Sequence, residues 1–178
     1  MKKVFFMVLL TIFAVSIYSH GQTLEPQMGL NGKWGFVNEY GNPVIPFRYD
    51  IADGFIEGVA AVKLNGKWGF IDKTDNVVIP FNYDWADAFF EGLSMVCFNG
   101  KWGFIDKTGE VVIPLKYDHV LGFSHELPGS LHGFLGPSKG LSLVCINGKY
   151  GFIDKTGTEV VPVRYTKEKA IRKFKTRV

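Results

Sequence analysis

The sequence is poor in the residues that build disulfide frameworks and metal sites. It contains two cysteines, Cys97 and Cys145, and four histidines among 178 residues. Two cysteines are too few for a disulfide framework. No glycine-rich phosphate loop precedes a helical pattern, and no Ser-His-Asp or Cys-His arrangement has supporting motif context. We therefore expect a non-enzymatic chain with no catalytic residue, no metal site and no cofactor.

Long apolar runs are also missing, except at the start of the chain. Two lysines precede a nearly unbroken apolar run from Val4 to Tyr18, and Ser19-His20-Gly21 follows it. This layout is typical of a secretory signal peptide, and the run is shorter than the roughly 20 residues of a spanning helix. We expect residues 1–21 to be cleaved before Gln22, which leaves a secreted or periplasmic protein with no stable membrane span. An uncleaved N-terminal anchor is the alternative.

Positive charge is scarce in the body of the protein. The formal net charge is +3, and removing the two N-terminal lysines leaves +1. Residues 166–178 carry +5, so residues 22–165 carry about −4. A nucleic-acid-binding protein concentrates positive charge on a recognition face, so we expect no nucleic-acid partner.

One phrase returns four times along the chain. Asn-Gly-Lys-Trp-Gly-Phe begins at Asn31, Asn65 and Asn99, and Asn-Gly-Lys-Tyr-Gly-Phe begins at Asn147. The intervals are 34, 34 and 48 residues. Each phrase leads into a turn such as Asp-Lys-Thr-Gly, then a β-branched run with a proline, then a tyrosine. Self-similarity at such a period indicates a repeat architecture.

The residues of each repeat favour strands over helices. A period of 34 also belongs to helical tetratricopeptide arrays, but the repeats are rich in Gly, Pro, β-branched and aromatic residues, which favour turns and strands. Asn-Gly is a strong hairpin signal. We predict an all-β fold: a tandem array of three-stranded antiparallel meanders, solenoid-like or curled. The repeat domain spans residues 22–165, with units near 28–58, 59–92, 93–140 and 141–165.

The basic tail, residues 166–178, has a different pattern. Ile171, Phe174 and Val178 lie at helical spacing among basic residues. This predicts a short basic C-terminal helix, which either caps the last repeat or contacts an anionic surface.

The repeated phrase Lys-Trp-Gly-Phe-Ile-Asp-Lys-Thr-Gly-x-Val-Val-Ile-Pro-x-x-Tyr-Asp resembles the WG repeat of bacterial proteins. The resemblance covers about Met28 to Tyr165. It implies an exported protein that binds through its repeats and has no catalytic residue. Two features depart from the pattern: Tyr150 replaces the tryptophan of the fourth unit, and a 14-residue insertion, Ser124 to Pro137, interrupts the third.

Aromatic residues recur once per unit. Trp68 and Phe70 lie two residues apart and therefore face the same side of a strand. Because one meander cannot bury its own apolar face, we expect these rings to form the core between repeats. An exposed ladder that stacks on sugars is the alternative. The set comprises Trp34, Trp68, Trp102, Tyr150, Phe36, Phe70, Phe104, Phe152, Tyr49, Tyr83, Tyr117 and Tyr165.

Aspartates recur with the rings. Each of Asp72, Asp106 and Asp154 stands alone at the first position of a turn, which predicts turn chemistry rather than a calcium site. The aspartates that follow the tyrosines, such as Asp84, are expected to be local caps. Both cysteines stand where the second unit has Lys63. We therefore expect partial solvent exposure there, and whether the two cysteines are bonded stays open.

The insertion is the segment that the repeat does not explain. It brings Leu131, Phe134 and Leu135 into a loop rich in Gly and Pro, and these are our candidate binding residues. We predict an exported binding or scaffolding module whose partner is a cell-envelope protein or polysaccharide, contacted through the repeat face or the insertion. A purely structural spacer, or an immunity-like partner protein with no small ligand, is the alternative. The mature histidines, His119, His125 and His132, match no standard metal-ligand spacing.

Deleting residues 124–137 should leave a folded, cooperatively melting array, because the deletion restores the 34-residue period and long loops contribute little to stability. Circular dichroism melts of the deletion variant and the parent test this. Loss of the strand signal would show that the insertion is structural.

Overall fold

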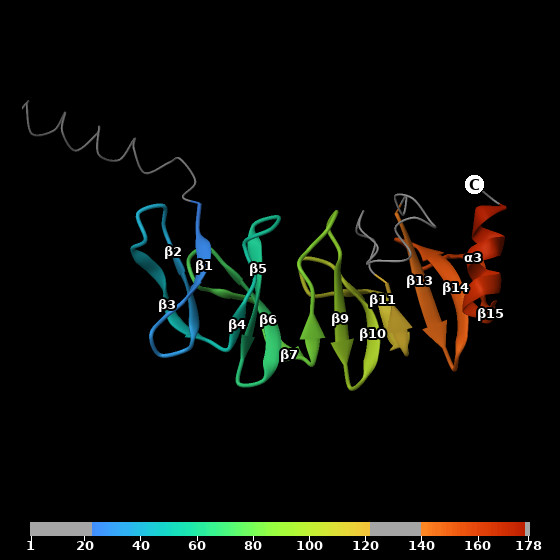
Figure 1. Cartoon of the computed structure of the whole chain (residues 1–178), viewed down its shortest axis with the longest axis horizontal. Coiled ribbons are helices and arrows are strands. Elements are labelled where there is room, and N and C mark those ends of the chain that lie inside the picture. The colour runs from blue at the N-terminus through green and yellow to red at the C-terminus, as the bar shows by residue number, and fades with distance from the viewer. Residues whose placement is uncertain (1–22, 122–139, 177–178) are drawn as a thin grey trace, which may run out of the picture.

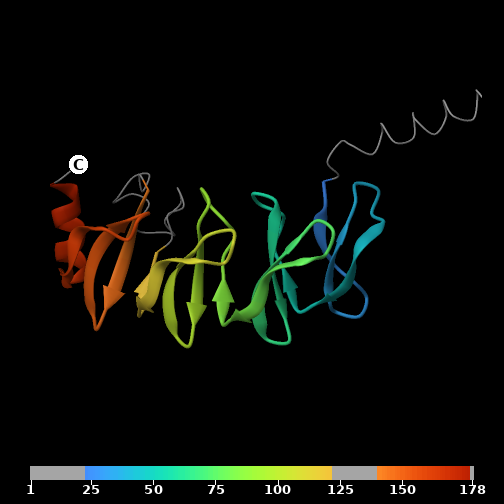
Figure 2. The same cartoon turned by 180° about the vertical axis from the view of Figure 1, so that it is seen from behind.

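The structure, a computed structural model, describes residues 23–121 and 140–176. These residues form four antiparallel β-sheets in a row along the long axis, with one helix at the C-terminal end (Figure 1). The view from behind shows the same row (Figure 2). The predicted all-β repeat array and short C-terminal helix are therefore confirmed.

The four sheets follow the chain in order. The first holds β1 (Glu25–Met28), β2 (Trp34–Val37) and β3 (Pro43–Tyr49). The second holds β4 (Ile51–Ala52), β5 (Val59–Leu64), β6 (Lys67–Asp72) and β7 (Val77–Tyr83). The third holds β8 (Trp85–Ala86), β9 (Ser94–Phe98), β10 (Lys101–Ile105) and β11 (Val111–Tyr117). The fourth holds β12 (His119–Val120), β13 (Leu141–Ile146), β14 (Lys149–Asp154) and β15 (Glu159–Tyr165), and helix α3 (Lys167–Lys175) follows.

Each later sheet has a short first strand that the repeat pattern did not predict. After Tyr49 the chain passes through Asp50 into β4, which pairs with β5 of the second sheet. Strands β8 and β12 begin the third and fourth sheets in the same way. Within the described residues, the first sheet has three strands and the others have four. One extended segment therefore ends each sheet and begins the next.

We call the aromatic residues of the repeated phrase the signature residues, with Tyr150 in place of the tryptophan in the fourth unit. The glycine after each signature tryptophan, or after Tyr150, is required by a close approach of two backbones. Trp68 pairs with Tyr83 and Phe70 with Ile79, so two steps along β6 oppose four steps along β7. The surplus residues of β7 bulge across Gly69. A Cβ atom on Gly69 would lie 2.7 Å from the carbonyl oxygen of Ile79 and 2.9 Å from the ring of Phe81. The equivalent glycines, Gly35, Gly103 and Gly151, meet the same obstruction.

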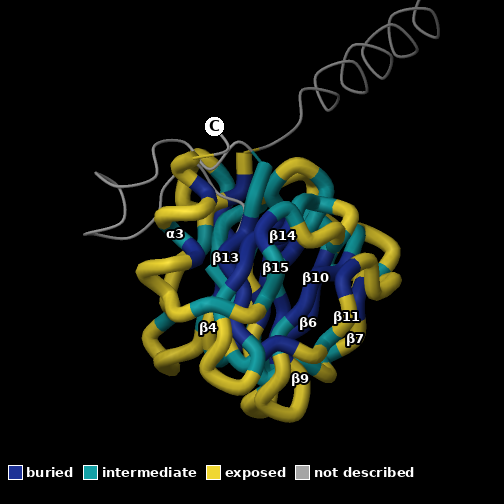
Figure 3. Tube along the Cα trace, turned by 90° about the vertical axis from the view of Figure 1, so that its right-hand side faces the viewer, coloured by how far each residue is buried: buried dark blue, intermediate teal, exposed yellow. Residues whose placement is uncertain are grey.

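Apolar side chains fill the space between successive sheets. We call the side of a sheet that points to the next sheet its forward face, and the opposite side its back face. Phe36 and Ile45 on the first forward face pack with Val62 and Ile71 on the second back face. The arrangement returns at the next two junctions. Seen along the array, buried residues occupy the central strands and exposed residues the surrounding turns (Figure 3).

Helix α3 closes the C-terminal end of the array. Thr166 caps its N-terminus, where the hydroxyl accepts a hydrogen bond from the amide of Lys169. Ala170 and Phe174 are buried against the forward face of the fourth sheet. The ring of Phe174 stacks on Phe152 with 4.7 Å between centroids. The tail therefore acts as a cap on the last repeat.

Replacing Gly69 by alanine should lower the free energy of unfolding by about 1–3 kcal/mol, as overpacking does. The obstructing atom belongs to the backbone and cannot rotate away. Gly54→Ala is the matched control, because the space around Gly54 is open and its φ is not positive. Urea titrations followed by tryptophan fluorescence measure both. Equal midpoints for the two variants would contradict the close-approach account.

Candidate functional site

The signature rings lie mainly between the sheets. Each phenylalanine of the Trp-Gly-Phe phrase is buried: Phe36, Phe70, Phe104 and Phe152. Trp68 is also buried, whereas Trp34, Trp102 and Tyr150 are half-buried. Phe36 and Phe70 each pack against a phenylalanine near the start of the following sheet, with 4.7 Å between the centroids of Phe36 and Phe55 and 4.9 Å between those of Phe70 and Phe89. These rings are arranged as packing elements, and they do not form an open row along one face.

One junction differs, because it brings exposed rings to the surface. Trp68 and Tyr83 are paired neighbours on the second sheet. The ring of Trp85 lies 5.5 Å from Trp68, and the ring of Phe98 lies 6.5 Å from Tyr83, edge to face. We call these residues the four-ring cluster. Its outer members, Trp85 and Phe98, are 48% and 40% exposed.

The four-ring cluster also holds an unsatisfied donor. Trp68 is only 3% exposed, and its buried indole Nε1 has no hydrogen-bond partner among the described residues. A buried polar group without a partner weakens the fold by roughly 1–3 kcal/mol. The cluster therefore combines two partly exposed rings with a buried donor beneath them.

The aspartates after the signature tyrosines bridge neighbouring units, so their predicted role as local caps is wrong. Asp50 accepts hydrogen bonds from Lys33 Nζ at 2.7 Å and from the amide of Gly66 at 3.0 Å. Lys33 belongs to the hairpin of its own unit and Gly66 to the hairpin of the next. Asp84 and Asp118 repeat the arrangement with Lys67 and Lys101. The lysine bond and the hairpin amides hold the pKa of each carboxyl below its usual range.

A second set of ion pairs joins the units through other turns. Glu57 pairs with Lys107 at 2.9 Å and accepts a hydrogen bond from the amide of Gly92. Glu91 pairs with Lys155 of the fourth sheet. Between the first two sheets, the Tyr49 hydroxyl donates to Asp75 at 2.6 Å, and burial raises the pKa of Tyr49 to about 12. Exposed pairs of this kind contribute little free energy each, but together they hold the register between units.

The turn aspartates behave as predicted. Asp72 Oδ1 accepts from the amides of Thr74 and Asn76 at 2.8 and 2.9 Å. The hydrogen bond from the Thr74 hydroxyl and, to a smaller extent, those from Asn76 lower the pKa of Asp72 to about 2. Asp106 and Asp154 make the same turn. These carboxylates stabilise the turns by accepting hydrogen bonds from the amides two and four residues further along the chain.

The other predicted site residues do not form a reactive group. Both cysteines are buried free thiols, so the expected solvent exposure is wrong for them, whereas Lys63 at the same position of the second unit is half-buried. In the described part of the chain no cluster of His, Cys, Asp and Glu fits a metal ion, and no helix is long and apolar enough to cross a membrane. His125, His132 and the candidates Leu131, Phe134 and Leu135 lie outside the described residues.

Sequence reasoning did not single out Trp85 or Phe98. A signal was present, since the position of Trp85 holds Ile51 and His119 in the neighbouring units, and that of Phe98 holds Leu64 and Ile146. Among the units compared, aromatic residues occupy both positions only at Trp85 and Phe98, at the junction between the second and third sheets. Exposure was the missing information, because it depends on how the sheets stack.

The junction aspartates should make stability depend on acid pH. Their folded-state pKa is depressed, so their stabilisation is present above the ordinary value of 3.8 and is lost as the pH falls below it. An Asp84→Asn, Asp118→Asn variant should melt earlier at neutral pH, and its melting temperature should change less between about pH 5 and pH 2.

Thermal melts by circular dichroism across this range give the comparison. Asp53→Asn is the control. Burial raises the pKa of Asp53, so removing this carboxyl does not reduce the drop in melting temperature toward acid pH. If the melting temperature of the double variant fell as steeply toward acid pH as that of the parent, the role given to Asp84 and Asp118 would be contradicted.

Comparison with known proteins bears on the whole array. No curated protein and no solved structure matches the chain. A family model described as WG containing repeat matches residues 34–68, 68–102, 102–127 and 150–167. Each matched stretch begins at a signature tryptophan or at Tyr150, and together they cover more than half of the sequence. The chain therefore belongs to the WG containing repeat family.

Proposed function

We propose that this protein is an exported, non-catalytic binding module whose contact surface is the four-ring cluster. One observation carries the proposal: the repeated rings and charges are engaged in packing, turns and ion pairs, whereas Trp85 and Phe98 add partly exposed rings, 48% and 40% exposed, at a single junction. Packing of the array accounts for the first group of residues and leaves the second unexplained.

The chemistry of the cluster fits a polysaccharide or a protein of the cell envelope. Tryptophan and tyrosine offer large rigid surfaces with a polar edge, and they dominate the binding energy of many contact surfaces. Next to the rings, Lys67 and Asp84 form an ion pair at the Asn-Gly hairpin tips. Apolar rings beside charged groups suit a ligand that presents both apolar faces and hydroxyl or amide groups.

The main competing function is a structural spacer with no ligand. The burial of Phe36, Phe70, Phe104 and Phe152 favours it, because packing then explains these repeated rings. The two functions differ in what Trp85 and Phe98 do, and this difference decides between them.

Replacing Trp85 or Phe98 by alanine should weaken binding about tenfold or more, as loss of an aromatic anchor does. We would measure retention of the protein on purified envelope polysaccharide and on immobilised envelope protein extract, as separate arms. Tyr40→Ala is the matched control, because Tyr40 is 78% exposed and lies in a turn of the first unit. Melts must show that each variant is folded.

Retention lost in one arm by both cluster variants, and kept by Tyr40→Ala, would support the proposal and identify the ligand class. Equal retention of the parent and the cluster variants in both arms would favour the spacer.

A further inference from the structure

The two end faces of the array are equivalent to the two faces that meet at each internal junction. The forward face of the fourth sheet carries Phe152 and Val161, which repeat Phe36 and Ile45 of the first. The back face of the first sheet carries Val37 and Phe47, which repeat Ile71 and Phe81 of the second. The same two surfaces pack together at each described junction within the chain.

Helix α3 occupies the forward half. The ring centroids of Phe174 and Phe152 lie 4.7 Å apart, and the same distance separates Phe36 from Phe55, which lies between β4 and β5 of the second sheet. Thr166 takes the position of the bridging aspartates and caps the helix instead of reaching toward a further hairpin. The tail therefore supplies from within the chain the ring that another repeat would otherwise supply.

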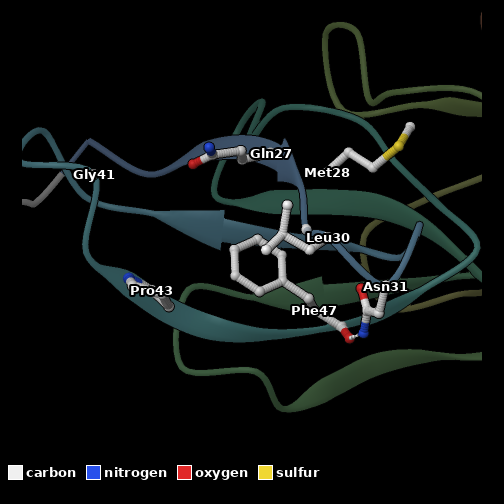
Figure 4. A pocket seen from close by; sticks show the side chains of 8 residues that line it. Gln27, Met28, Leu30, Asn31, Gly41, Pro43 and Phe47 are labelled. Carbon is white, nitrogen blue, oxygen red and sulfur yellow. Dashed lines mark hydrogen bonds between the residues drawn. The ribbon is translucent and has the colours of Figure 1, made fainter.

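The back half is only partly covered among the described residues: Val37 is buried and Phe47 is half-buried, but no further sheet packs over them. A hollow of about 530 Å³ lies on the first sheet, lined by Met28, Leu30, Gly41, Pro43 and Phe47 among others (Figure 4). The side chain of Leu30 is fully exposed and lies beside the ring of Phe47. In the second sheet the equivalent ring, Phe81, packs against Tyr49 of the first sheet, with 6.3 Å between the ring centroids.

Two polar residues interrupt this otherwise apolar back face. Glu25 and Gln27 pair with Val37 and Gly35 in β1 and β2. The equivalent pairs in the second sheet place Ala60 and Val62 there, both fully buried. Covering Glu25 and Gln27 with another sheet would bury a carboxylate and an amide without partners, which is unfavourable.

We propose that the two ends are complementary head-to-tail docking surfaces for a second copy of this chain, and that two devices keep the copies apart. Helix α3 covers the forward face, and Glu25 with Gln27 makes the back face a poor match. A head-to-tail contact does not close on itself and propagates into fibres, so an array with apolar faces at both ends needs a block. The described junctions show what fills such a surface: the opposite face of a WG unit.

The test releases both devices in the chain that begins at Gln22, the mature form expected after export. Phe174→Asp undocks α3, and Glu25→Ala with Gln27→Val restores the back-face residues of the second sheet. Sedimentation velocity over a concentration series should show one species for the parent and for the back-face pair alone. The combined variant should form a concentration-dependent series of oligomers. Phe174→Asp alone should associate about tenfold more weakly than the combined variant, because the polar pair is still buried on docking.

Further single substitutions, made in the combined variant, identify the surface through which it assembles. Phe47→Glu should return it to a single species, whereas Val111→Glu, the same kind of change at an exposed residue of the third sheet, should leave assembly unchanged. Thr166→Asp should tighten assembly about fivefold, since the new carboxylate reaches the hairpin of the next copy as Asp50 reaches Gly66.

Several outcomes would overturn the proposal. The combined variant would remain one species while keeping its strand signal, or it would assemble equally well with Phe47→Glu. Assembly of the parent itself would show that the two devices do not keep the copies apart. If Phe174→Asp loses the strand signal, Ala170→Glu replaces it, because Ala170 lies in the same buried contact of α3.

Discussion

The burial of both faces of each sheet against its neighbours is the constraint on which this structure depends. A meander of three or four short strands presents apolar side chains on two sides and has no second layer of its own. Ile71 and Phe70 are adjacent on one strand, and one is buried against the first sheet and the other against the third. Stability therefore comes from the junctions, and a unit removed from the row would expose both halves of its core.

The Trp-Gly-Phe phrase follows from that constraint. The phenylalanine fills the junction, and the glycine lets the bulged third strand cross close above the second. The bulge carries Phe81 onto the back face, where it meets the preceding unit. Lysine and aspartate at the hairpins then tie adjacent tips together. Packing supplies most of the free energy, and the exposed ion pairs hold the register.

Where the repeats depart from their own pattern, other roles become possible. Thr166 in place of aspartate ends the series of bridges and begins a helix that covers the last sheet. Glu25 and Gln27 stand in the first sheet where the second has Ala60 and Val62. Trp85 and Phe98 place aromatic surface at one junction. Each departure changes what the surface offers while leaving the stacking intact.

The sequence by itself determined the strand class, the hairpin and turn positions and the repeat register, because Asn-Gly, Asp-Lys-Thr-Gly and Val-Val-Ile-Pro act through local backbone geometry. Asp72, for example, bonds residues two and four positions ahead. The tertiary structure alone decided which residues join units, since Asp50 reaches Gly66 and Glu57 reaches Lys107 only after the sheets stack. It also decided that the cysteines are buried and that Trp85 is open. Both depend on contacts between sheets, which no local pattern encodes.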